Sequence, residues 1–198
     1  MECPDRRWSP RRPALFLLCY VAIVIPWLPE SLLAGEFGLE TLAVRYGVSG
    51  GSPIGEEQRI RFQQADVAIT ARLPWEREIA SEWILGTKIL GSAGMLRGAK
   101  EENAVVTFLP LDIWFGRKDG LVAIDVGGGF GLLSDYKFGP QNFGGPFQFV
   151  WTFGINSRFL GPLGAGYHFQ HYSDATLYGK DSRGVDLHLF ELVYWFGK

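Results

Sequence analysis

The sequence contains very little cysteine. Its two cysteines, Cys3 and Cys19, lie near the N-terminus, so the remainder of the 198-residue chain has none. A domain of that kind uses neither disulfides nor thiolate metal ligands, and backbone pairing and packing must hold it together. Histidine is scarce too: there are three, and no His-Glu-x-x-His motif occurs among them. We therefore expect no metal and no cofactor.

Charge of one sign and long apolar runs are also missing. The chain has 19 Lys and Arg against 21 Asp and Glu, a net charge of −2. This balance provides no basic surface for nucleic acid, so we expect no nucleic-acid partner. The apolar run at residues 14–25 is shorter than the roughly 20 residues that a membrane-spanning helix needs. It is therefore not expected to be a helical anchor.

The N-terminal segment has the layout of a secretory signal peptide. Its apolar run is followed by the small-residue stretch Ser31 to Ala34. The basic residues that precede the run are Arg6, Arg7, Arg11 and Arg12. A basic start, a short apolar stretch and a small-residue cleavage site are the three parts of an export signal. We expect residues 1–34 to be removed, with cleavage after Ala34 or Gly35, and residues 35–198 to form one exported domain.

That domain has the composition of a β protein, rich in glycine and aromatic residues and divided by turn formers. Lys118-Asp119-Gly120 is the clearest hairpin turn. No long segment has the period of a helix. The predicted strands lie near residues 39–49, 59–73, 83–96, 104–116, 121–133, 147–157, 163–173 and 185–196.

Alternation within these segments indicates a membrane barrel. The segment at 147–157, for example, places Phe149, Trp151 and Phe153 on one face and Thr152 and Gly154 on the other. An apolar outer face with a small or polar inner face is typical of outer-membrane strands, which need about 9–11 residues to cross. A soluble lipocalin-like barrel would invert the pattern. We favour an all-β, eight-stranded, antiparallel up-and-down outer-membrane barrel in contact with outer-membrane lipids.

The last two predicted strands contain a candidate hydrolase triad. His171 and Ser173 are two residues apart, so they share one strand face at a spacing of about 7 Å. Histidine can take a proton from a serine hydroxyl, and Asp186 on the following strand supplies a carboxylate that orients the imidazole. A His-x-Ser pair also occurs by chance, so a packed histidine beside an incidental serine is the alternative.

These residues resemble the lipid A 3-O-deacylases, the PagL-type acyloxyacyl hydrolase family. The similarity rests on the signal, the eight strands, His171 and Ser173 ending the penultimate strand, and Gly184 to Asp186 opening the last. It implies an outer-membrane esterase of a Gram-negative bacterium that removes an ester-linked acyl chain from the lipid A of lipopolysaccharide. Ser173 would be the nucleophile, His171 the base and Asp186 the orienting acid. Among partners we also consider a second copy of the chain in a homodimer.

Three positions depart from the family pattern. Asp186 stands where the family often has glutamate. The aspartate side chain is shorter by one methylene, so its carboxylate reaches less far. Asp174 and Thr176 replace the asparagine and glycine that the family favours after the serine. An ionised Asp174 would repel a developing oxyanion rather than stabilise it. The second function class is therefore a non-catalytic barrel, structural or surface-binding.

Overall fold

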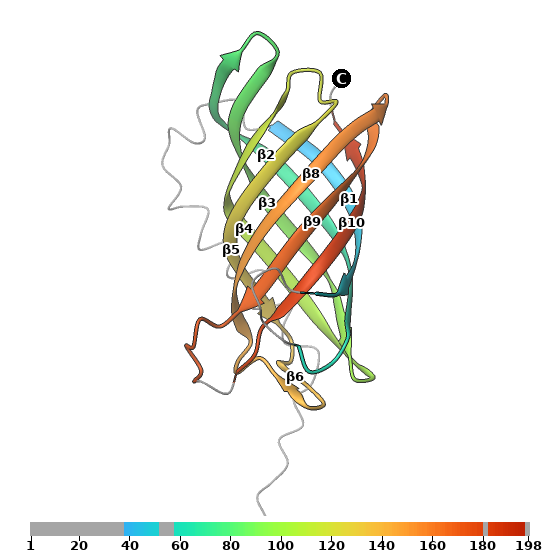
Figure 1. Ribbon diagram of the computed structural model, residues 1–198, viewed down its shortest axis with the longest axis vertical. Helices are drawn as coiled ribbons and strands as arrows, with labels where there is room; N and C mark the ends of the chain where they lie inside the picture. Colours follow the sequence, from blue (N-terminus) through green and yellow to red (C-terminus); the bar gives the residue numbers. More distant parts are fainter. Residues whose placement is uncertain (1–37, 52–57, 180–181, 197–198) are drawn as a thin grey trace, which may run out of the picture. The chain divides into compact units, whose positions relative to one another are not determined.

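The computed structural model describes residues 38–51, 58–179 and 182–196, and these residues form a closed antiparallel barrel (Figure 1). Each strand pairs with its sequence neighbours and the last strand closes on the first, which confirms the predicted fold class. The predicted signal segment, residues 1–34, lies outside the described residues. The wall consists of β1 (Gly38–Ser49), β2 (Phe62–Ala80), β3 (Trp83–Gly98), β4 (Glu101–Arg117), β5 (Ala123–Leu133), β8 (Phe147–Leu160), β9 (Leu163–Ser173) and β10 (Val185–Trp195).

The two ends of the barrel differ in their connections. The loop end carries the long connections after β1, β5 and β9, and the second of these contains the small hairpin of β6 (Lys137–Phe138) and β7 (Gln141–Asn142). The turn end carries short connections, including the predicted turn at Asp119 and Gly120. A hydrogen bond from Arg117 lowers the pKa of the Asp119 carboxyl to about 2. The β2–β3 hairpin projects from the turn end, opposite β6 (Figure 1).

Strand limits lie within two residues of the predicted ones except in β2, at the start of β4 and at the end of β8. The predicted strand at 59–73 ended just before Pro74, but β2 continues through this proline to Ala80. A register shift between Arg72 and Glu76 accommodates the proline, which cannot donate to a ladder. The glutamates at 76, 78, 101 and 102, which lie outside the predicted strands, are therefore part of β2 and β4.

Outward and inward faces follow the predicted alternation. Val44, Phe153 and Leu192 are 63%, 50% and 72% exposed on the outer wall. On the inner face, glycines allow the backbone of a neighbouring strand to approach closely. A Cβ on Gly129 would lie 2.1 Å from the Phe108 carbonyl oxygen. The apolar groups thus face the bilayer, as in outer-membrane barrels rather than soluble ones. Within the described ranges, no helix is long and apolar enough to cross a membrane.

Buried charges occupy the middle of the lumen, and they are paired. Arg45 donates two hydrogen bonds to Asp66, at 2.6 and 3.1 Å. Lys88 and His168 both contact Asp125, at 3.1 and 2.9 Å. A buried ion is tolerated only when a partner offsets its lost hydration, so breaking one of these pairs is costly.

Aromatic side chains fill the loop end of the lumen. Phe62 from β2 packs edge-on against Phe138 and Phe143, which belong to the β5–β8 connection, with ring centroids 5.2 and 5.6 Å apart. All three are almost fully buried and join the core cluster that includes Tyr172 and Leu189. Because this plug occupies the loop end, the polar part of the lumen opens at the turn end.

Candidate active site

The candidate catalytic residues lie on the outer wall at the loop end, where β9 ends and β10 begins. The register of this strand pair places His171 directly opposite Asp186. His168 occupies the inner face and contacts Asp125, so strand alternation separates it from His171 on the outer face. Strand alternation and one register therefore fix the relative positions of the base and the acid.

His171 and Asp186 are joined by a short hydrogen bond. Nδ1 of His171 lies 2.5 Å from Oδ1 of Asp186, and the two residues are 5% and 0% exposed. A carboxylate accepts only, so in the resting pair Nδ1 carries the proton and donates it to Asp186. This leaves Nε2 as the basic nitrogen of the ring, the arrangement that orients a general base.

Ser173 shares the outer face with His171 but stands apart from it. Its cross-strand neighbour on β8 is Phe149, and the serine is half-buried. Its hydroxyl forms no hydrogen bond with any described residue. An i, i+2 pair on a strand is separated by about 7 Å at the backbone, so both side chains must turn toward each other to meet. The structure thus joins two of the three predicted residues directly and leaves the third nearby.

Two contacts around the His–Asp pair were not predicted. The indole of Trp151 lies across from His171 on β8, with ring centroids 5.7 Å apart. Gln58, ahead of β2, donates to the backbone carbonyl of Asp186 at 3.0 Å. The alternation of β8 does place Trp151 on the outer face, but its position beside His171 depends on the β8–β9 register, which the sequence alone does not fix.

Asp174 serves the loop that follows the serine. Its Oδ1 accepts from the Thr176 N–H at 3.1 Å, and its Oδ2 accepts from the Tyr178 N–H and the Ser182 hydroxyl at 3.0 and 2.7 Å. The Leu177 N–H donates to the Asp174 carbonyl and closes a tight turn. The Asp174 carboxylate therefore anchors this loop, and Asp186 is the acid beside His171.

That turn places two non-glycine residues in the left-handed region. Ala175 and Thr176 have φ values of 50° and 66°. A β-branched residue in this conformation is strained because its Cβ crowds the backbone. Position 176 is one of the positions at which the sequence departs from the family that it resembles, so this departure has a conformational consequence close behind Ser173.

No group of three or more His, Cys, Asp or Glu side chains is arranged to hold a metal ion among the residues that the structure describes. The polar side-chain groups near His171 are the Asp186 carboxylate and the Ser173 hydroxyl. The chemistry that this outer-wall site can offer from its own residues is nucleophilic and acid–base.

Comparison with known proteins identifies the family. The family model for lipid A 3-O-deacylase (PagL) matches residues 63–195. This chain belongs to the PagL family. The matched region contains Ser173, His171 and Asp186, and it begins in β2 and ends with the last residue of β10.

A solved structure shows the same fold. The crystal structure of the outer membrane enzyme PagL superposes with a TM-score of 0.61 at 15% identity, covering 78% of this chain and 98% of that one. The outer membrane protein Ail of Yersinia pestis covers 80% of this chain and 99% of its own, at 11% identity and a TM-score of 0.41. No curated protein sequence matches the chain. Family and barrel together indicate the outer membrane of a Gram-negative bacterium.

Proposed function

We propose that this protein is an outer-membrane esterase that removes the acyl chain attached at the 3-O position of lipid A. Membership of the PagL family supports the substrate class. The observation that carries the reaction type is the 2.5 Å hydrogen bond from His171 Nδ1 to the buried Asp186. A histidine oriented by a carboxylate and set two residues from a serine is the arrangement that activates a hydroxyl for attack on an ester.

The proposed reaction has two halves. Nε2 of His171 removes the proton of the Ser173 hydroxyl while Oγ attacks the ester carbonyl carbon, and Asp186 stabilises the imidazolium that forms. When the tetrahedral intermediate collapses, the ester C–O bond breaks and His171 returns its proton to the departing sugar oxygen. Water then attacks the acyl-serine with His171 again acting as base, which releases the fatty acid and restores Ser173.

Substrate binding would bring Ser173 and His171 into reach of each other. A proton transfer of this kind needs heavy atoms about 2.6–3.2 Å apart, and unliganded hydrolases often hold a longer separation. The Trp151 ring beside His171 limits the directions in which the imidazole can tilt. Rotation of the Ser173 side chain is therefore the movement that we assign to substrate binding.

The developing oxyanion requires donors that Asp174 does not supply. Its carboxylate already accepts from Thr176, Tyr178 and Ser182, so we assign no oxyanion role to it. Backbone N–H groups directly after Ser173 are the nearest alternative, and donors of this kind are worth about 2.7–4 kcal/mol in other acyl-transfer enzymes. The tight turn beginning at Asp174 fixes where these groups point.

The place of the site on the barrel suits a lipid substrate. Phe149 beside Ser173 is 45% exposed on the outer wall. Phe153, four residues further along β8 from the loop end, is 50% exposed. An acyl chain lying along this wall would keep its hydrocarbon environment while its ester reached the loop end, where the polar head begins. The enzyme would then need no extraction of lipid from the membrane.

Kinetics of purified variants test the proposal. In detergent, with lipid A as substrate, we expect Ser173→Ala and His171→Ala each to lower kcat/KM by at least a thousandfold, and the double variant to be no worse than either, because members of one triad fail together. Ser157→Ala, a serine at the turn end that donates to the Leu121 carbonyl, is the matched control. Multiplying losses in the double variant, or full activity without Ser173, would favour the non-catalytic barrel.

We also propose that residues 1–34 are a cleaved export signal, since they lie ahead of β1 and combine a basic start with a short apolar run. N-terminal sequencing of the protein recovered from membranes tests this. A mature chain that begins at Gly35 or Glu36 is the expected result, and retention of Met1 contradicts it.

A further inference from the structure

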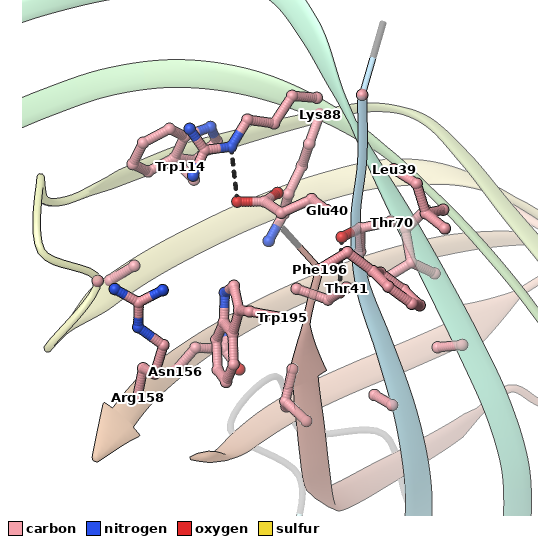
Figure 2. A pocket seen from close by; sticks show the side chains of 18 of the residues that line it. Leu39, Glu40, Thr41, Thr70, Lys88, Trp114, Asn156, Arg158, Trp195 and Phe196 are labelled. Atoms are coloured by element: carbon pink, nitrogen blue, oxygen red, sulfur yellow. Dashed lines mark hydrogen bonds and ion pairs between the residues drawn. The ribbon is translucent and has the colours of Figure 1, made fainter. Parts of the chain in front are cut away.

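A cavity lies in the lumen at the turn end, away from the outer-wall residues Ser173, His171 and Asp186. It has a volume of about 290 Å³ and is lined by the ends of several strands and their connecting turns. Figure 2 shows Trp114, Lys88, Glu40, Trp195 and Arg158 arranged around one open space. The aromatic plug of Phe62, Phe138 and Phe143 occupies the opposite end of the lumen. Among the described residues, the way into this cavity is therefore from the turn end.

Cations outnumber carboxylates in the lining of this cavity. Five Lys or Arg residues line it against two carboxylates, Glu40 and Glu191. Such an excess in a low-dielectric concavity raises the local concentration of anions. The excess matters for binding only where a cation is not already neutralised by a neighbour.

Four of the five cations have a carboxylate partner. Arg72 pairs with Glu40 at 2.8 Å, and Lys88 pairs with Asp125 at 3.1 Å. At the rim, Arg117 pairs with Glu82 at 2.9 Å and Lys118 pairs with Glu78. These pairs hold the wall and the projecting hairpin together, and they leave little charge for a ligand.

Arg158 is the exception. It is only half-buried, and its Nη2 donates to the backbone carbonyl of Asp119. No carboxylate pairs with it anywhere in the described ranges of the chain. A guanidinium presents five N–H donors in a rigid fork that matches the oxygens of a phosphate or carboxylate, so this group retains most of its donors.

One further donor of the lining has no partner. The indole N–H of Trp114 is buried and donates to no described residue. Buried donors are normally satisfied, so an unpaired one in a cavity wall points to an occupant with acceptor oxygens. A volume of about 290 Å³ has room for a phosphate group with a small organic body beside the indole of Trp195.

We propose that the turn-end cavity binds a phosphate group carried on a small organic body, with Arg158 as its principal ligand. The phosphate could belong to a soluble ester or to the headgroup of a lipid at the nearer membrane surface; the recognition chemistry is the same. The site does not include the outer-wall residues Ser173, His171 and Asp186. The two ends of the barrel then have different functions, ester hydrolysis at the loop end and anion binding at the turn end.

Titration calorimetry on the folded full-length barrel in a non-ionic detergent tests this, with inorganic phosphate and glycerol 3-phosphate as soluble probes. A third arm follows tryptophan fluorescence as phosphatidylglycerol is added to the micelles. We expect saturable binding in at least one arm, and the arm that saturates identifies the source. Arg158→Gln should weaken it about tenfold or more, as the loss of a charge-assisted hydrogen bond does, while lipid A hydrolysis stays unchanged.

Arg77→Gln is the matched control. Arg77 is exposed on the projecting hairpin at the same end and does not line the cavity, so its loss changes the net charge equally. Arg158→Lys keeps the charge but not the fork, and it should bind with intermediate affinity. Absence of saturation in all three arms, or an equal loss in Arg158→Gln and Arg77→Gln, would overturn the proposal.

Discussion

Replacing Gly154 with alanine tests how tightly the inner wall is packed around the buried charges. Gly154 on β8 lies directly opposite His168 on β9. A Cβ at this position would stand 2.0 Å from Cδ2 and 2.1 Å from Nε2 of the His168 ring. That nitrogen is the atom that contacts Asp125 at 2.9 Å, so the methyl group cannot enter without displacing the contact.

Three effects determine how much Gly154→Ala lowers the free energy of unfolding. Overpacking a closed site costs about 1–3 kcal/mol, and loss of the His168 contact weakens a buried charge pair whose complete rupture costs about 3–5 kcal/mol. Lys88 still donates to Asp125, so only part of the free energy for rupture of the charge pair is lost. The lower backbone entropy of unfolded alanine returns about 0.4–1 kcal/mol. We expect Gly154→Ala to lower the free energy of unfolding by about 2–4 kcal/mol.

Gly128→Ala is the control for this experiment. Gly128 lies on the neighbouring strand β5, and a Cβ there would meet nothing within 4 Å. It should leave the free energy of unfolding unchanged or raise it by up to about 1 kcal/mol. Urea titration of the detergent-folded barrel, followed by tryptophan fluorescence, measures both variants. A difference between them below about 1 kcal/mol would refute the packing argument.

Three further outcomes are expected. The mature protein should require detergent for extraction and migrate differently on gels before and after boiling; recovery as a soluble monomer would favour the lipocalin-like alternative. Thr176→Gly should raise the free energy of unfolding by about 0.5–1 kcal/mol in urea titrations, because relief of left-handed strain of about 1–2 kcal/mol exceeds the entropy cost of glycine; destabilisation contradicts this. Asp186→Asn should lower kcat strongly but incompletely, and Asp174→Asn should lower it less; the reverse order would identify Asp174 as the acid.

Much of the barrel could be predicted because its periodicity is local. An alternation such as Phe149, Trp151 and Phe153 specifies a strand and its lipid-facing side within a few residues. The same rule separated His168 from His171. The strand end predicted before Pro74, a turn-forming residue, was wrong, because the register shift that lets β2 continue depends on the partner strand β3, which a single segment does not encode.

The candidate site was harder to predict from the sequence, because the registers of the strand pairs determine which of its residues are neighbours. His171 and Asp186 are 15 residues apart in the chain, and only the β9–β10 register makes them neighbours. Trp151 and Gln58 join them through another strand and another loop, and neither carries a motif of its own. The role of Asp174 also depended on loop geometry, since its three donors follow it in sequence but meet only after the turn closes.

Mass spectrometry of lipid A from Gram-negative cells tests the central claim most directly. Cells that produce the wild-type chain are compared with cells that produce equal amounts of folded Ser173→Ala protein in the outer membrane. The account predicts that lipid A from the first cells loses the mass of one ester-linked acyl chain from the 3-O position, and that lipid A from the second keeps it. Unchanged lipid A in both, or the same loss in both, would contradict an esterase that uses Ser173.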